Sequence, residues 1–381
     1  MPAPPELSAE LWQRVEAFMA GAAEDPDAIA ADLAAWADGG PPEDLEGVLD
    51  ALRDLGAYPI SLPLLAAAWE AEMPEDLLGR VAHDRVGTIL HGFGDRPGAL
   101  RIAREMQGRA LELGPAFAGD LGDLWLSLGL VEAADPLVRA AAAEHPGDLA
   151  LRFNLGVVQK LAREWAASRE SFLAVLRHHD DQAACWNLGI ACTALEDWAG
   201  ARAAWQTLGF DLPPGEGDFA ALGEVVAIAL PTPDGSEVVW GRRLCPARAE
   251  VRTLPFLSGF AQFGDVVLLD GVPAGEVAYP EGQWGPVLPA LTVLHARGTR
   301  TLVAQGPLSP RGKAAVARAA ELLNGRGWPA ADWTELSGNA HLALAVGVVP
   351  PRTDAEARAA LAEVTLGLPL GPAHLHERLL P

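Results

Sequence analysis

The residues whose side chains could carry chemistry are few, and most lie in the C-terminal half of the chain. His295, Arg297 and Arg300 flank one expected hairpin turn, and an imidazole beside two guanidinium groups could hold an anion. Asp265 precedes an apolar strand, where a carboxylate more often bonds its own turn than acts as a base. The pair Arg297-Gly298 is equally typical of an exposed turn, so these residues form either a ligand site or ordinary turns.

Two pairs of residues have the types that bind metals but not the spacing. Cys185 and Cys192 share one face of an expected helix, whereas zinc sites prefer tighter spacings, and a buried free cysteine behaves as a small hydrophobe. His374 and His376 alternate on an extended segment with no further ligand nearby. We therefore predict no metal site, no cofactor and no catalytic residue, and the sequence favours a protein that is not an enzyme without settling the question.

The charge of the chain limits its partners. The 381 residues carry a formal net charge of −23, and residues 1–76 contain 17 acidic side chains but only two basic ones. Such a surface repels nucleic acid, so we expect no nucleic-acid partner. Two interpretations remain: the charge either keeps an alanine-rich helical array soluble or attracts a basic partner.

Other features of composition indicate the compartment. No apolar run approaches the ~18 residues of a membrane helix, and the first ten residues have neither a basic stretch nor an apolar core. Three cysteines are too few for a disulfide framework. We therefore expect a cytoplasmic protein with no membrane partner. Lysine occurs only twice while Ala, Gly and Pro are abundant, which reflects the base composition of the genome and not chemistry.

The elements that must position these residues change character near residue 213. Before it, apolar residues recur every three or four positions between closely spaced Gly and Pro, which predicts antiparallel helix pairs. After it, short Val- and Leu-rich runs with hairpin signals predict strands. We expect three regions: degenerate capping helices over 1–75, helical repeats over 76–213 and an α+β domain over 214–381.

An internal repeat marks the helical half. Its second copy follows the first after 33 residues, in three matched pairs of segments: Phe153-Asn154-Leu155-Gly156 with Trp186-Asn187-Leu188-Gly189, Trp165 with Trp198, and Phe172 with Trp205. This pattern resembles the tetratricopeptide repeat (TPR), whose period is 34 residues. A further copy is expected upstream at Trp125, Leu128 and Gly129, with about seven residues missing from its turn.

The TPR resemblance implies a right-handed helical solenoid whose first helices line a concave face that binds peptides or protein segments. It places Asn154 and Asn187 where an asparagine often bonds a peptide backbone, with Val157, Ile190 and Lys160 beside them. Asparagine is also simply the common residue there. Because only Lys160 is basic, an apolar or basic segment fits this face better than an acidic one.

The C-terminal half predicts two β-containing pieces. Short strands between Val225 and Tyr279 indicate a small antiparallel barrel or curled sheet. Strands over Leu291–Ala296, 301–304, 333–336 and 342–349, with helices from Ser309 and Asp354, have the order of a ferredoxin-like split β-α-β unit.

This half also resembles an uncharacterised bacterial domain family. The resemblance rests on Trp240 on an early strand, the pair Pro255-Phe256, and the turn Gly264-Asp265-Val266-Val267. It implies no known activity.

Three functional hypotheses follow. The first is a scaffold that binds a partner segment in the concave groove of the solenoid. The alternative is an enzyme or small-ligand sensor whose site in the C-terminal half contains Asp265, His295, Arg297 and Arg300. The third is self-association, in which Leu375, Leu379 and Leu380 of the tail fill a groove.

Overall fold

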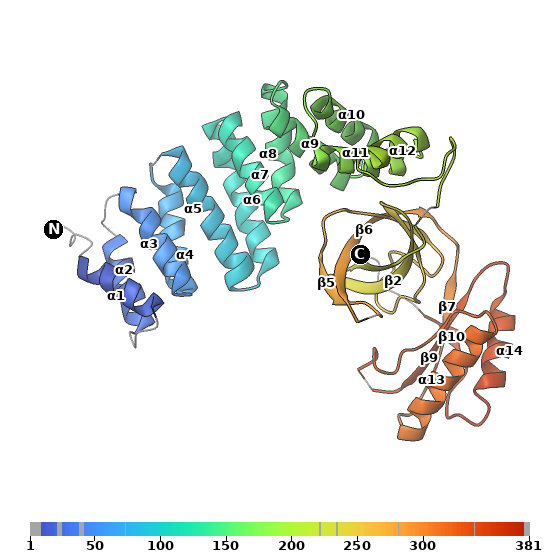
Figure 1. The fold of residues 1–381 in the computed structure, drawn as a ribbon. Coiled ribbons are helices and arrows are strands. Elements are labelled where there is room, and N and C mark those ends of the chain that lie inside the picture. Colours follow the sequence, from blue (N-terminus) through green and yellow to red (C-terminus); the bar gives the residue numbers. More distant parts are fainter. Residues whose placement is uncertain are drawn as a thin grey trace. The chain divides into compact units, whose positions relative to one another are not determined.

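A computed structural model describes residues 9–20, 25–37, 42–72, 74–220, 222–233, 235–280, 282–338 and 340–376. Helices fill the first half and two sheets the second (Figure 1). The chain forms two compact units, Met1–Val158 and Gln159–Pro381, and the boundary between them lies within the helix Leu149–Leu161. No helix among the described residues is long and apolar enough to cross a membrane.

The first half is a series of helices joined by short turns, as the sequence predicted. They are α1 (Ala9–Met19), α2 (Pro26–Ala37), α3 (Pro42–Asp54), α4 (Tyr58–Glu70), α5 (Glu75–Gly87), the π-helical turn η1 (Thr88–Gly92), α6 (Arg96–Leu113), α7 (Pro115–Ser127), α8 (Val131–Glu144), α9 (Leu149–Leu161), α10 (Trp165–Leu176), α11 (Gln182–Ala194) and α12 (Trp198–Thr207). Aspartate side chains cap four of the described helices: Asp95, Asp148, Asp181 and Asp197 each accept a hydrogen bond from the backbone N–H three residues later.

The glycine of a Leu-Gly pair lets the second helix of the repeat pack closely against the first at Gly122 and Gly189. A Cβ atom on Gly189 would lie 2.6 Å from the ring of Trp205 on α12, and one on Gly122 would lie 2.7 Å from Val138 on α8. The same pair recurs at Leu78-Gly79, Leu121-Gly122, Leu155-Gly156 and Leu188-Gly189. The prediction that the upstream copy has its Leu-Gly pair at Leu128-Gly129 was therefore wrong, because Gly129 lies in the turn between α7 and α8 with φ of 69°. With the pair at Leu121-Gly122, the turn is not seven residues short.

The first sheet closes on itself. It contains β1 (Val225–Thr232), β2 (Gly235–Cys245), β3 (Arg248–Val251), β4 (Val266–Leu269), β5 (Gly275–Ala278) and β6 (Trp284–His295), in the order β1-β2-β3-β4-β6-β5. Neighbours are antiparallel, and β6 also pairs in parallel with β1, so five strands form a ring around a core that includes Ile228, Val239 and Leu269.

The second sheet is antiparallel, in the order β10-β7-β9-β8. Its elements follow one another as β7 (Arg300–Gly306), α13 (Pro310–Gly325), β8 (Ala330–Asp332), β9 (Leu342–Val348), α14 (Asp354–Val364) and β10 (His374–Leu375). One apolar core joins the sheet to both helices, and another joins its Val303 and Ala345 to Leu254 and Trp333. Both faces of β9 are therefore buried.

Two expected strands differ from those observed. Leu291–Ala296 is not the start of the second piece, because all but its last residue is the end of the long strand β6, which pairs with β4. Of the expected strand 333–336, residues 334–336 lie in a turn, whereas Trp333 follows the end of β8 at Asp332, is buried and donates its backbone N–H to Ala343 on β9. The expected helices from Ser309 and Asp354 are confirmed as α13 and α14, and their caps are the side chains of Ser309 and Thr353.

Candidate functional site

A groove of about 600 Å³ lies between α5 and α7, the first helices of two successive repeats. All of its lining residues come from these two helices: Glu75, Asp76, Gly79, Arg80, His83, Phe117, Asp120, Leu121, Asp123, Leu124 and Ser127. Asp120 and Asp123 stand 34 residues before Asn154 and Val157, so they occupy the positions that the TPR resemblance assigns to partner contacts. The sequence interpretation missed them because it placed the Leu-Gly pair of this repeat seven residues too late.

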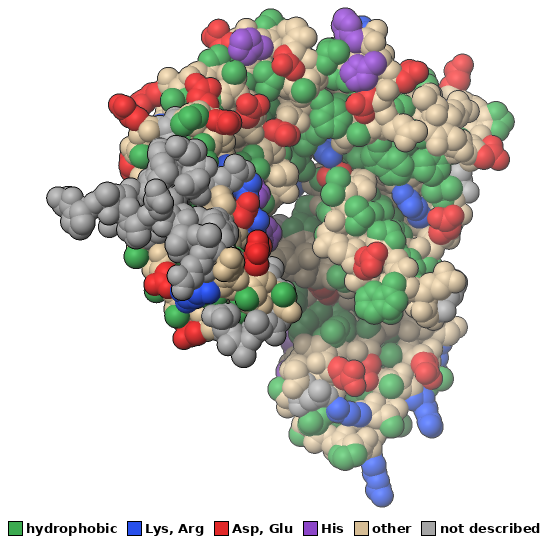
Figure 2. All heavy atoms as spheres, turned by 60° about the vertical axis from the view of Figure 1, so that its left-hand side comes forward, with side chains coloured by type: hydrophobic (Ala, Val, Ile, Leu, Met, Phe, Trp, Pro, Cys, Tyr) green, Lys and Arg blue, Asp and Glu red, His purple; other side chains and the backbone are tan. Residues whose placement is uncertain are grey.

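The groove is rich in unneutralised acids. Glu75, Asp76, Asp120 and Asp123 are exposed, and among the described residues none of them has an ion-pair partner. On the face shown in Figure 2, acidic side chains are visibly more numerous than those of lysine and arginine. The groove therefore attracts positive charge.

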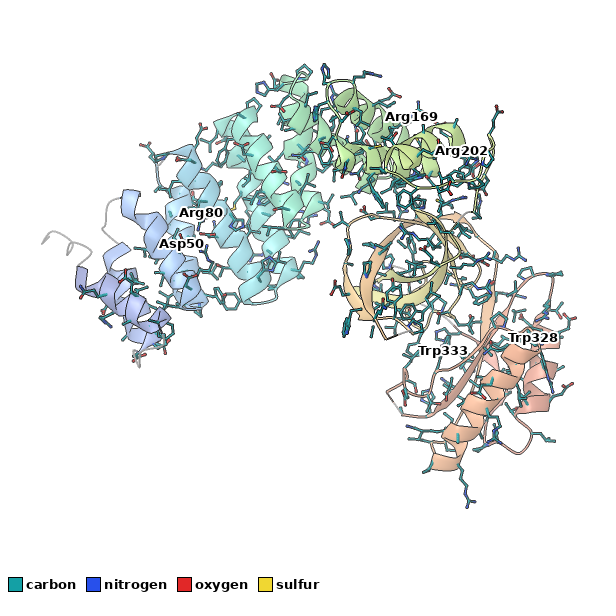
Figure 3. All side chains as sticks on the ribbon, viewed as in Figure 1. Asp50, Arg80, Arg169, Arg202, Trp328 and Trp333 are labelled. Carbon is teal, nitrogen blue, oxygen red and sulfur yellow. The ribbon has the colours of Figure 1, made fainter. Side chains whose placement is uncertain are left out.

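Arg80, the one arginine in the groove, is already neutralised. It is bound by Asp50 on α3, and Figure 3 labels both residues; the Arg80 Nε donates to Asp84 over 3.0 Å. His83 Nδ1 lies 2.9 Å from the same carboxylate. Burial acts to raise the pKa of Asp84, but the hydrogen bond of His83 and the charge of Arg80 outweigh it, so the pKa lies below its usual range.

The predicted partner-binding residues divide into two groups. Asn154 and Val157 are half-buried, and the Asn154 amide donates to Asp123 over 3.1 Å, which ties it to the acidic groove. In contrast, Ile190 is fully buried and Lys160 is only 3 % exposed.

Lys160 is held by a carboxylate of the C-terminal half. Its Nζ donates to the two oxygens of Asp270 over 2.8 and 3.0 Å, and to Asn187 Oδ1 over 2.8 Å. Asp270 follows β4, and its backbone N–H is fixed by Pro289 in the ring of strands. The polar groups of Lys160 and Asn187 are therefore bound within the chain itself.

The backbone next to Asp270 lies against α11, the helix that carries Asn187. A Cβ atom on Gly271 would lie 1.9 Å from Nε1 of Trp186, so only glycine fits there. We call Lys160, Asn187, Trp186, Asp270 and Gly271 the clasp. Two arginines strengthen this junction: Arg202 on α12 donates to the carbonyls of Pro213 and Gly217, and Arg248 on β3 stacks over Trp198 on α12 at 4.5 Å.

Of the four residues of the possible second site, the structure joins only Asp265 and Arg297, through the Arg297 backbone, while His295 and Arg300 have other partners. Asp265, 4 % exposed, accepts the backbone N–H groups of Gln262 (2.8 Å) and Arg297 (2.6 Å), which is a turn-stabilising role. His295 lies 3.8 Å from Glu196, and Arg300 pairs with Asp354 over 2.9 Å. The side chains of His295, Arg297 and Arg300 are exposed.

The other residues singled out in the sequence are also engaged in packing. Cys185 and Cys192 are buried thiols, and burial raises the pKa of Cys192 to about 12. His376 stacks on Phe256 and bonds its carbonyl over 2.8 Å. Leu375 lies in β10, whereas Leu379 and Leu380 lie outside the described residues.

Comparisons with known proteins give similarity in the solved structures alone. No family model and no curated protein matches the chain. MamA MSR-1 is similar at 16 % identity and a TM-score of 0.33, over 44 % of this chain and 94 % of its own. MamA from Desulfovibrio magneticus RS-1 shows 15 % identity and a TM-score of 0.27 over 54 % and 96 %. YrrB, a TPR protein with an unusual peptide-binding site, shows 16 % identity and a TM-score of 0.30 over 42 % and 80 %.

Proposed function

We propose that this protein binds a segment of a partner protein in the groove between α5 and α7. The observation that carries the proposal is that four exposed acids in that groove have no ion-pair partner among the described residues, and two of them, Asp120 and Asp123, stand at the register positions of Asn154 and Val157. A solenoid presents such a face as a continuous surface because each repeat contributes one first helix to it.

The partner segment is basic, with apolar residues between its charges. Glu75, Asp76 and Asp120 supply negative charge at the rim, while Leu124 and the ring of Phe117 supply apolar surface. Asn154, held by Asp123, stands at the end of this row and bonds the backbone of the segment. Nucleic acid is repelled by the same charges.

The last repeat has a different role in this proposal, because its residues bind the C-terminal domain through the clasp.

We assign 1–75 to the cap, 76–213 to the repeats and 214–381 to an α+β domain. Closure of β1 on β6 supports a small barrel, and the sheet order β10-β7-β9-β8 with its two helices supports a ferredoxin-like split unit. The three free cysteines suit a reducing cytoplasm.

Selection from a library of random 12-residue peptides displayed on phage tests the proposal with the full chain as bait. We expect the selected peptides to combine Lys or Arg with apolar residues. Their affinity, measured by fluorescence anisotropy, falls at least tenfold for the double variant Asp120→Asn/Asp123→Asn.

The matched control is Glu112→Gln/Glu144→Gln, which removes the same charge from exposed positions on the second helices α6 and α8. Equal loss of affinity in both double variants would attribute binding to net charge and reject the groove. Peptides without basic residues would reject the proposed partner chemistry.

A further inference from the structure

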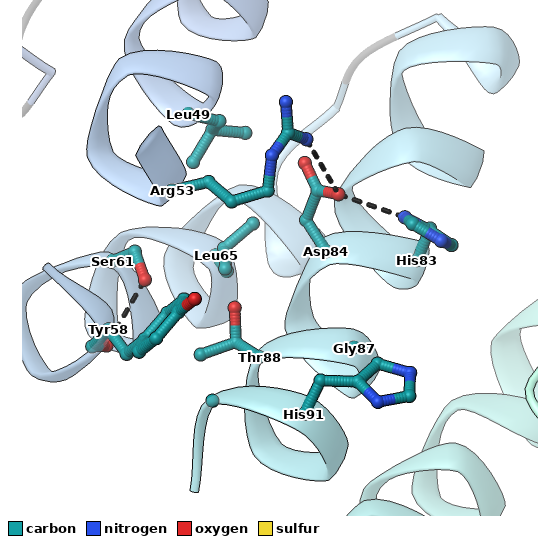
Figure 4. A pocket seen from close by; sticks show the side chains of 11 residues that line it. Leu49, Arg53, Tyr58, Ser61, Leu65, His83, Asp84, Gly87, Thr88 and His91 are labelled. Atoms are coloured by element: carbon teal, nitrogen blue, oxygen red, sulfur yellow. Dashed lines mark hydrogen bonds and ion pairs between the residues drawn. The ribbon is translucent and has the colours of Figure 1, made fainter. Parts of the chain in front are cut away.

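A second cavity, of about 130 Å³, lies among α3, α4, α5 and the π-helical turn η1 (Figure 4). It shares only His83 with the groove. Its lining residues are Leu49, Arg53, Tyr58, Ser61, Leu65, His83, Asp84, Gly87, Thr88, His91 and Gly92. All belong to the first compact unit.

The local sequence of α5 and η1 opens this space. Gly87 has helical φ and ψ, and a Cβ atom added to it would meet nothing within 4 Å. Gly92 lies so close to the ring of Tyr58 that a Cβ atom would lie 2.8 Å from it. The end of α5 and the π-helical turn therefore each place one glycine on the cavity wall, and single π-turns within helices often occur at functional sites.

The charges around the cavity balance one another. The Asp84 carboxylate is bonded by Arg80 and His83, and Arg53 lies 3.9 Å from it. A charged ligand would find no unpaired opposite charge here and would lose its hydration without compensation. The cavity therefore suits an uncharged molecule.

The remaining wall combines apolar side chains with the His91 imidazole and three hydroxyl groups, of which that of Ser61 already donates to the Tyr58 carbonyl over 3.1 Å. Leu49 and Leu65 contribute methyl groups, and Figure 4 shows the hydroxyls of Tyr58 and Thr88 turned towards Leu65. Thr88 is 9 % exposed, and among the described residues its hydroxyl and that of Tyr58 have no hydrogen-bond partner. Neither hydroxyl oxygen is among the fully buried polar atoms without a partner, so both can be reached from the cavity and can hydrogen-bond a polar atom of the ligand.

We propose that this cavity binds an uncharged molecule about the size of one aromatic ring, with one polar group hydrogen-bonded to Thr88. An engineered cavity of about 150 Å³ in another protein holds benzene, which sets the scale. This site does not depend on the proposed function, because its lining shares only His83 with the partner groove and its ligand is a small molecule, not a protein segment.

Calorimetric titration of the full chain with phenol tests the proposal, with toluene and benzoate as comparison probes. We expect phenol to bind with one-to-one stoichiometry and a Kd below about 1 mM, and benzoate to show no binding. Thr88→Val keeps the side-chain shape and should weaken phenol about fivefold, the equivalent of one hydrogen bond, while toluene is unchanged.

Gly87→Leu fills the cavity and should abolish phenol binding. Its control is Gly108→Leu, the same substitution at an exposed helical position on α6 where an added Cβ also meets nothing. Circular dichroism checks that both variants fold. Undiminished phenol binding by a folded Gly87→Leu protein, or no phenol binding by the unmodified protein at 10 mM phenol or below, would overturn the proposal.

Discussion

Lys160 and Asp270 form an ion pair that water hardly reaches. Their side chains are 3 % and 10 % exposed, and Asn187 completes the coordination of the ammonium. Removing one member of a buried pair leaves an uncompensated charge, which costs far more than loss of an exposed pair. The clasp therefore concentrates much of its stabilisation in one side chain.

Substitution of Lys160 tests this directly. We expect Lys160→Met to lower the free energy of unfolding by about 3–5 kcal/mol, as measured by urea denaturation. Arg101→Met is the control: it breaks the pair with Glu105, whose members are 65 % and 55 % exposed, and should cost under about 0.5 kcal/mol. Equal effects of the two substitutions would contradict a buried, uncompensated charge.

Asp84 makes stability depend on pH. Its folded-state pKa is lowered, so the unfolded chain binds a proton more readily than the folded protein. The stabilisation is present above the ordinary carboxyl value of 3.8 and is lost as the pH falls through the lower folded value. Urea denaturation between pH 5 and 3 should show a smaller decrease for Asp84→Asn than for the unmodified protein. Identical pH profiles would argue against this contribution.

Residue-level sequence reasoning reached some of these groups but not their partners. The repeat register selected Asn187 and Lys160, whose polar groups do meet. It could not show Asp270 beside them, because that contact joins positions 110 residues apart in sequence. The assignment of Asn187 and Lys160 to partner binding stays a prediction. A partner would have to bind them while they keep, or give up, their contacts in the clasp.

The turn after β4 docks on α11 because Gly271 has no side chain. We expect Gly271→Ala to lower the free energy of unfolding by about 1–3 kcal/mol, since the methyl group would overlap the Trp186 indole. Gly147→Ala is the control, as an added Cβ there meets nothing within 4 Å and φ is not positive. A thermal melt of each variant compares them, and no difference between the two would show that the turn is not closely packed.

Elements with a strong local signal were predictable, while those defined by pairing were not. The pair Ser309-Pro310 predicted the start of its helix through capping chemistry, and the structure adds Thr353 as the cap of the helix expected from Asp354. The length of β6 depends on three partner strands, β1, β4 and β5, which no local pattern records. The two-residue strand β10 exists only through its pairing with β7.

At the scale of the whole molecule, the division into helices and then strands was predictable from periodicity, since it depends on the local spacing of apolar residues. The division into compact units depends on contacts. It falls at Val158, because the last helices pack with the strands through the clasp and Arg248. A change of pattern at residue 213 marks a change of secondary structure, and tertiary contacts cross it.

The net charge of −23 makes partner binding sensitive to salt, if the groove binds as proposed. Exposed charges are screened over about 10 Å at 0.1 M salt and about 3 Å at 1 M. Between 50 and 500 mM NaCl we therefore expect the affinity for a selected basic peptide to fall at least tenfold, by fluorescence anisotropy. The Asp120→Asn/Asp123→Asn variant should lose less, because fewer charges remain to be screened. A salt dependence that is the same in both proteins would place the attraction outside the groove.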